Sequence, residues 1–171
     1  MARAMHMTKD ITMRDTHFWW HAILAGVIGG AVFLVAEMLL VTLTGQSPWA
    51  PPRMIAAMIL GESVLPPPAT LDGSIMMAAM LVHFPLSMVY GVVIGWIVQR
   101  TARYNYTRAL AEGAVIGLAI YLVNFHLIAS FVFEWFAMAR NWVSVVAHLI
   151  FGLATAWAYL ALAQPRASRN G

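Results

Sequence analysis

Long runs of apolar residues, separated by short polar stretches, dominate the pattern along this chain. Four of the runs are longer than the about 20 residues that a helix needs to cross the hydrocarbon layer of a bilayer. Helices suit that layer because they satisfy their backbone hydrogen bonds internally. The pattern therefore predicts four membrane-spanning helices, at residues 18–44, 75–98, 109–133 and 141–162.

Two short connections, residues 99–108 and 134–140, predict how these helices are arranged. A tight connection places consecutive helices side by side and antiparallel. We therefore expect an all-α integral membrane fold, an antiparallel four-helix transmembrane bundle in which residues 1–171 form a single transmembrane domain. Pairs of small residues spaced four apart predict close helix contacts, or room for a flat cofactor ring. They are Gly26/Gly30, Gly91/Gly95, Gly113/Gly117 and Gly152/Ala156.

The long connection, residues 45–74, contains a proline-flanked apolar stretch at residues 54–60. This stretch is too short to cross a membrane. Proline is favoured in the first turn of a helix, and glycine is favoured just after the last turn. We therefore expect a short helix that begins near Pro52, ends at Gly61, and is interfacial or re-entrant on the periplasmic side.

Composition and charge support lipid as the solvent and give an orientation. The chain is 61% hydrophobic and 10% charged, against about 25% charged residues in soluble domains. Eight of its ten basic residues flank one side of the predicted spans, and the positive-inside rule makes that side cytoplasmic. The eight are Arg3, Lys9, Arg14, Arg100, Arg103, Arg108, Arg166 and Arg169, and the other two are Arg53 and Arg140.

This distribution predicts a multi-pass protein of the bacterial inner membrane with cytoplasmic N- and C-termini. Topology accounts for the net charge of +3, so no nucleic-acid partner is expected. The first apolar run is too long for the core of a signal peptide and follows 17 polar residues, so we interpret it as the first span.

Each predicted span carries one ionisable side chain in its periplasmic half. These side chains are Glu37, His83, His126 and His148. Each lies seven or eight residues from the periplasmic end of its span, which places all four roughly 10–12 Å below the surface at about 1.5 Å per residue. Ionisable groups in lipid usually face the bundle interior, so we expect one polar layer of a carboxylate and three imidazoles.

Such a layer favours metal chemistry without thiolates, because the chain has no cysteine. Glu37, His83, His126 and His148 together suit Zn²⁺, Fe²⁺ or Mn²⁺. Alternatively, two of the three histidines are axial ligands of a b-type haem. A third version uses Met76, Met80 and His83, which share a helical face and suit Cu(I).

Each of these side chains also has an ordinary interpretation. A lone histidine in a membrane helix commonly hydrogen-bonds a neighbouring helix, and methionine is an adaptable filler of apolar packing. Glu37 alone is explained by a hydrogen bond to a backbone carbonyl or to Asn124. The chain has no glycine-rich phosphate loop and no G-x-S-x-G elbow, so nucleotide or soluble-type hydrolase chemistry is not expected.

Several local motifs resemble a family of small four-span bacterial inner-membrane proteins of unknown function, akin to those grouped as YagU-like. The motifs are G-V-I-G-G-A-V from Gly26, R-M-I-A-A-M-I-L-G from Arg53, L-V-H-F-P-L-S-M-V-Y-G from Leu81, G-A-V-I-G-L-A-I-Y from Gly113 and A-H-L-I-F-G from Ala147. The resemblance extends over nearly all the chain and implies the four-span topology. His83 and His148 match histidines of the family's second and fourth spans, whereas the family implies no biochemical activity.

The leading functional hypothesis is a metal- or haem-binding accessory or electron-transfer subunit of a larger membrane complex. Its expected partners are the lipid bilayer and other membrane-protein subunits or further copies of itself. One alternative is a purely structural or assembly subunit without a cofactor. Another is a small oligomeric proton or metal transporter that uses Glu37 and the histidines as a relay.

Overall fold

The computed structural model of the chain describes residues 2–163, and for residues 2–16 it describes the backbone only. Every regular element in this part of the chain is a helix. The α-helices are α1 (Ala2–Leu43), α2 (Ala50–Leu60), α3 (Gly73–Thr101), α4 (Tyr106–Leu122), α5 (Ala129–Phe131) and α6 (Trp142–Ala163). Two short 3₁₀ helices, η1 (Glu62–Val64) and η3 (Glu134–Ala139), and a π-helix, η2 (Val123–Ile128), complete them.

Four helical segments are long and apolar enough to cross a membrane, as the sequence predicts. They are His17–Leu43, Gly73–Thr101, Tyr106–Phe131 and Trp142–Ala163. Side-chain caps determine where two of them begin. Asp72 accepts hydrogen bonds from the backbone of Ser74 and Ile75 at the start of α3, and Asn105 accepts one from Arg108 at the start of α4. Both caps satisfy amides that have no partner inside the helix.

The short helix predicted in the long connection is α2. Proline occupies its first turn, where the missing amide costs nothing. It ends at Gly61, whose φ of 80° suits glycine and disfavours other residues. Arg53 fastens α2 to the following loop by donating hydrogen bonds to the carbonyl oxygens of Val64 and Thr70.

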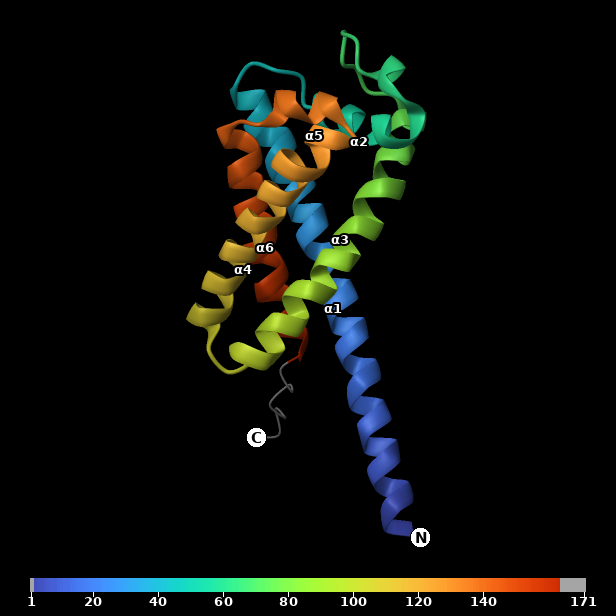
Figure 1. Cartoon of the computed structure of the whole chain (residues 1–171), viewed down its shortest axis with the longest axis vertical. Helices are drawn as coiled ribbons and strands as arrows, with labels where there is room; N and C mark the ends of the chain where they lie inside the picture. Colours follow the sequence, from blue (N-terminus) through green and yellow to red (C-terminus); the bar gives the residue numbers. More distant parts are fainter. Residues whose placement is uncertain (1, 164–171) are drawn as a thin grey trace, which may run out of the picture.

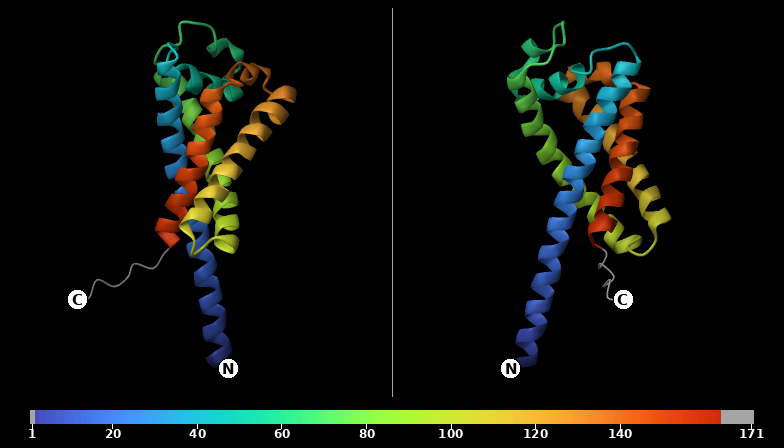
Figure 2. Two further views of the ribbon diagram at one scale, coloured as in Figure 1. Left: turned by 90° about the vertical axis from the view of Figure 1, so that its left-hand side faces the viewer. Right: turned by 180° about the vertical axis from the view of Figure 1, so that it is seen from behind.

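Helix α6 lies between α1 and α4, and α1 also packs against α3 (Figures 1 and 2). Helices α3 and α4 therefore lie at opposite ends of this row and touch each other little. Helix α2 and η3 lie at one end of the bundle, whereas α1 begins and α6 ends at the other (Figure 1).

Small residues allow the close contacts, as their spacing predicts. A Cβ atom added at Gly91 would lie 2.6 Å from the Ala22 carbonyl oxygen and 2.7 Å from the Gly26 nitrogen. Gly113 and Gly117 approach the backbone of α6 in the same way. These glycines therefore make helix contacts, and neighbouring helices fill the space that a cofactor ring would need.

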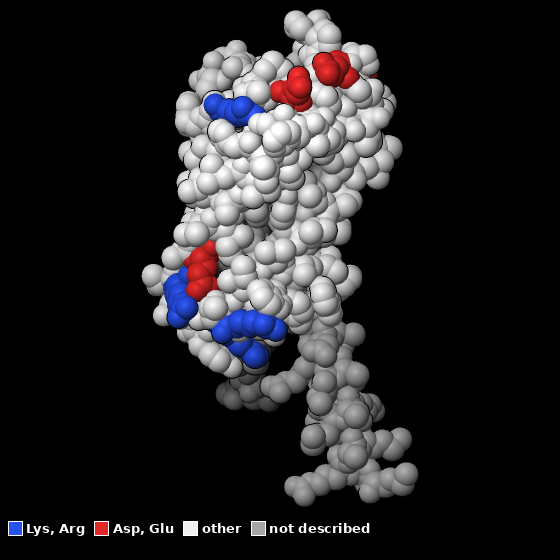
Figure 3. Space-filling view, in the orientation of Figure 1, with Lys and Arg blue, Asp and Glu red and all other residues white. Residues whose placement is uncertain are grey.

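The end of the bundle opposite α2 is more tightly packed. Ile94 and Val98 near the end of α3, and Tyr159 and Leu160 near the end of α6, are among the largest fully buried side chains. Figure 3 shows the charged side chains of this face at the two ends of the molecule, with an uncharged band between them. The end that carries α2 is built differently, because it holds a larger, partly open cavity.

A candidate ligand chamber beneath α2

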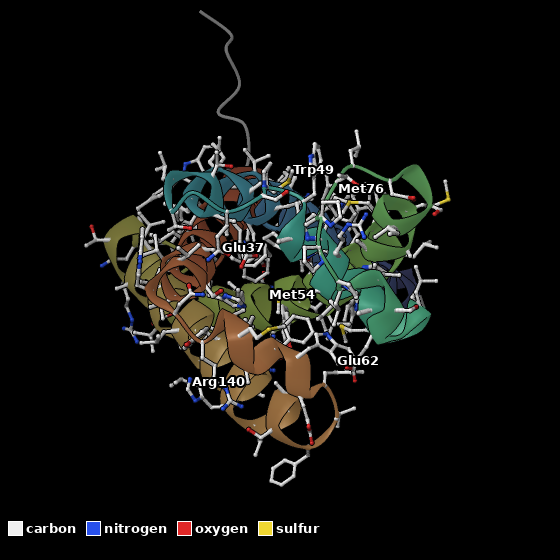
Figure 4. All side chains as sticks on the ribbon, turned by 90° about the horizontal axis from the view of Figure 1, so that it is seen from above. Glu37, Trp49, Met54, Glu62, Met76 and Arg140 are labelled. Atoms are coloured by element: carbon white, nitrogen blue, oxygen red, sulfur yellow. The ribbon has the colours of Figure 1, made fainter. Side chains whose placement is uncertain are left out.

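A cavity of about 390 Å³ lies between α1, α3, α4–η2 and α6, under α2 and η3. We call it the chamber. Figure 4 looks into this end of the molecule and shows Glu37 and Met54 near its centre, surrounded by the helices. Its walls are mostly aromatic and aliphatic. The polar side chains that line it include Glu37, His83, Ser87, Tyr90, Asn124, Ser144 and His148.

The chamber exists because α3 and α4 diverge toward α2. At the narrow end of the gap, the Tyr90 hydroxyl donates to Asn124 Oδ1 at 2.7 Å and ties the two helices together. At the roof, Trp135 Nε1 donates to the Met54 carbonyl oxygen at 3.1 Å and joins η3 to α2. Pro85 lies inside α3 between His83 and Ser87, where its missing amide weakens the helix and favours a bend.

The π-helix η2 contributes to the chamber wall. Asn124 and Phe125 of this segment line the cavity. A π-helix leaves backbone groups without their usual partners, and such segments are frequent at functional sites. Arg140 supplies one partner, because its Nε donates to the Phe125 carbonyl oxygen at 2.7 Å.

Glu37 is the only carboxylate among the side chains that line the chamber, and it is 6% exposed. Its Oε1 accepts a hydrogen bond from the Ser144 hydroxyl at 3.1 Å. Within the described residues, this is its one hydrogen bond, and the single ion pair there joins Arg108 to Glu112. An ionised carboxylate in such a wall has a high desolvation cost unless a cation or more donors approach it.

His148 is held beside Glu37 by the same serine. Its Nδ1 lies 2.7 Å from the Ser144 carbonyl oxygen. A carbonyl only accepts, so Nδ1 carries the hydrogen and Nε2 carries the lone pair. The rings of Phe33 and Phe125 surround the imidazole edge to face, with centroid distances of 4.9 and 5.4 Å.

His83 has the opposite tautomer. Its Nε2 lies 2.9 Å from the Gly30 carbonyl oxygen, so this nitrogen carries the hydrogen. Its ring stacks on Phe33 with a centroid distance of 5.5 Å. Iron ligation through His83 Nε2 would require this hydrogen bond to break, so the residues as arranged do not fit a haem held by both His83 and His148 through Nε2.

His126 is separated from the other three members of the predicted layer. It is exposed, does not line the chamber, and its Nε2 lies 3.3 Å from the Tyr121 hydroxyl. The structure therefore brings together Glu37, His83 and His148 and leaves His126 on the outside of the bundle.

The described residues contain no group of three or more His, Asp or Glu side chains placed to hold one metal ion. The methionines of the copper version do not join His83 in the chamber wall, because Met80 packs against the small apolar cluster between α2 and α3. Binding of a metal or haem stays a prediction.

Ser144 and Tyr90 are chamber residues that the sequence did not single out. A signal for Ser144 exists, because it precedes His148 by four residues and thus shares its helical face. Tyr90 has a similar relation, since it follows His83 by seven residues. Asn124 accepts a hydrogen bond from Tyr90 of α3, whereas the hydrogen-bond donor to Glu37 is Ser144.

Comparisons of the chain with protein-family models, with curated proteins and with solved structures found no match. The resemblance to YagU-like proteins therefore stays a prediction. A function for the chain has to be inferred from the chamber itself.

Proposed function

We propose that this chain is a multi-pass protein of the bacterial inner membrane that binds a small organic ligand in the chamber, on the periplasmic side. One observation carries the proposal: the chamber has about 390 Å³ of space, apolar walls and a few convergent polar groups. Small-molecule sites typically have about 300–1,000 Å³ and this composition. The chain then acts as an accessory ligand-binding subunit beside other membrane-protein subunits or further copies of itself.

In this proposal the spans are antiparallel, both termini are cytoplasmic, and α2 is an interfacial helix at the periplasmic surface. The eight-to-two distribution of basic residues supports this orientation. Exposed tryptophans support the two interfaces, since Trp20 and Trp96 lie near one end and Trp142 begins α6 at the other. Tryptophan is enriched at both surfaces of a bilayer.

A transition-metal ion is the second candidate ligand, and the geometry of His148 favours it. Histidines that bind metals usually donate their other ring hydrogen to a carbonyl or carboxylate, as Nδ1 does here. Glu37 and His148 would be the protein ligands, and the metal would supply redox or Lewis-acid chemistry. Metal analysis and a visible spectrum of the purified protein test this candidate, which a colourless, metal-free and folded sample would contradict.

The chamber itself is tested by a single cysteine, because the natural chain has none. Val82 lines the chamber, whereas its neighbour Leu81 is 66% exposed on the outside. We expect a small, membrane-impermeant thiol reagent added from the periplasmic side to modify Val82→Cys. Leu81→Cys at the same depth should stay unmodified, because lipid covers it.

A filling substitution gives the second arm of this experiment. Met54→Trp, in the roof, should slow the modification of Val82→Cys at least about tenfold, since it places a large ring in the space that the reagent crosses. Equal rates for Val82→Cys and Leu81→Cys in the folded protein would contradict a water-accessible chamber.

A further inference from the structure

Two polar side chains of the chamber wall, Glu37 and His148, offer free acceptors to a ligand. Glu37 Oε1 accepts a hydrogen bond from the Ser144 hydroxyl, whereas Oε2 has no hydrogen bond within the described residues. Because Nδ1 of His148 carries the hydrogen, its Nε2 is also an acceptor. Both groups bond to one residue of α6, Ser144, since Glu37 reaches it from α1 and His148 lies one turn further along α6, so we place their free acceptors in one part of the chamber wall.

The histidine, serine and tyrosine donors of the chamber wall are already used by the protein, whereas the side-chain amides of Gln46, Asn124 and Asn141 donate no hydrogen bond within the described residues. His83 Nε2 donates to the Gly30 carbonyl oxygen, and the Ser87 hydroxyl donates to the His83 carbonyl oxygen. The Tyr90 hydroxyl donates to Asn124. Arg53 also lines the chamber, but its guanidinium donates to Thr70 and Val64 in the loop. A ligand that matches Glu37 and His148 must therefore bring hydrogen-bond donors, and a positive charge to match the carboxylate.

The remaining walls suit a cation on an apolar body. Phe33, Phe125 and Phe151 line the chamber with Tyr90. The faces of aromatic rings attract ammonium groups, and the attraction is larger where water is excluded. An engineered cavity of 150 Å³ holds benzene, so about 390 Å³ holds roughly 10–15 non-hydrogen atoms.

From these contacts we infer that the ligand of the chamber is an organic amine in its protonated form, with an aromatic or aliphatic body. Its ammonium group donates to Glu37 Oε2 and His148 Nε2, and its body packs against the aromatic walls. The inference rests on the proposed function and names the ligand class of the same chamber. The ammonium group supplies the charge that the buried carboxylate lacks within the protein.

Three ligands of nearly equal shape test the inference: 2-phenylethylamine, 2-phenylethanol and 3-phenylpropionate. The readout is the concentration of each that protects Val82→Cys from an uncharged thiol reagent. The protein is held in nanodiscs of zwitterionic lipid with a metal chelator present. We expect protection by the amine at a concentration about tenfold or more below that of the alcohol, because only the amine adds an ion pair with the buried carboxylate to its hydrogen bonds. The carboxylate should protect least.

Glu37→Gln is the decisive variant, because glutamine retains the acceptor for Ser144 and removes the charge. In this background, the amine should protect no better than the alcohol. His126→Gln, outside the chamber, is the matched control and should leave the preference unchanged. Equal protection by amine and alcohol in the natural sequence would overturn the inference and leave the chamber as a site for uncharged ligands. Modification of Val82→Cys without protection by any of the three would overturn the inference together with the proposed function.

Discussion

Ser144 connects the polar groups of the chamber. Its hydroxyl donates to Glu37 and its carbonyl oxygen accepts from His148, so one residue positions the carboxylate and sets the tautomer of the imidazole. Ser144 is itself held at the start of α6, where Asn141 Oδ1 accepts from its backbone amide at 3.3 Å. A short chain of hydrogen bonds thus fixes the one carboxylate that the described residues bring to the chamber wall.

At the residue scale, we predict that Ser144→Ala destabilises the protein by about 1–3 kcal/mol, because it leaves a buried carboxylate without its donor. Thermal or denaturant unfolding in detergent measures the effect. Thr42→Ala is the control, since the Thr42 hydroxyl bonds only within its own exposed turn, and it should change stability by at most about 0.5 kcal/mol. Equal stability of the two variants would contradict the role assigned to Ser144.

Sequence spacing gives an expected depth for the four ionisable residues but not the direction in which each one points. Depth follows from the rise of a helix, whereas direction depends on rotation by about 100° per residue from an unknown origin. Asn124 and Phe125 face the chamber, so His126, one step further around the helix, faces outward. The π-helix at this point changes the rotation of the following side chains around the helix axis, and the residue pattern did not predict it.

At the element scale, the helices depend on close backbone contacts and on side-chain caps. The sequence predicted the contacts, because small residues spaced four apart mark a helix face that a neighbour can approach. It also predicted the four spans and α2, since length and apolar character decide both. It missed the caps, which move the start of the second span from 75 to Gly73 and of the third from 109 to Tyr106.

Gly91→Ala tests the contact between α1 and α3. The added methyl would meet the Ala22 carbonyl oxygen at 2.6 Å, and backbone atoms on both helices cannot easily shift. We expect a loss of stability of about 1–3 kcal/mol, as for other overpacked sites. Gly73→Ala is the matched control, because nothing lies within 4 Å of its added methyl. A stability for Gly91→Ala equal to that for Gly73→Ala would contradict the close approach of the two helices.

The cap of α3 predicts a local dependence on pH. The Ser74 hydroxyl and the backbone amide of Ile75 donate to Asp72 and lower the pKa of its carboxyl group. A lowered pKa means that the cap is fully present above the unfolded-state pKa of about 4 and is lost as the pH falls through the folded-state pKa. Amide hydrogen exchange at Ser74 and Ile75, corrected for its intrinsic pH dependence, should therefore lose protection in acid.

The start of α4 provides the control for this prediction. Its cap is Asn105, whose side chain accepts from the Arg108 amide and does not titrate. Protection at Arg108 should stay constant over the same pH range. An equal loss of protection at both helix starts would indicate general unfolding and would contradict titration of the Asp72 cap.

At the scale of the whole molecule, the larger cavity of the bundle lies at one end. The order α3, α1, α6, α4 leaves the two outer helices with few contacts between them, and their divergence opens the chamber under α2. This shape was not predictable from the four apolar runs, because it depends on which helices become neighbours and at what angle. Apolar character favours the insertion of each helix into lipid, but it does not determine which neighbouring helix it packs against.

The orientation of the end that holds the chamber decides what the chamber meets, and single cysteines in the cysteine-free chain report it. Ser63 lies exposed in η1 beside α2, and Tyr104 is 87% exposed in the connection at the opposite end. We expect an impermeant thiol reagent applied to right-side-out membranes to modify Ser63→Cys and spare Tyr104→Cys, because three arginines near Tyr104 favour the cytoplasmic side. Membranes turned inside out should reverse the result. Modification of Tyr104→Cys alone in right-side-out membranes would place the chamber toward the cytoplasm, and its ligand would then come from inside the cell.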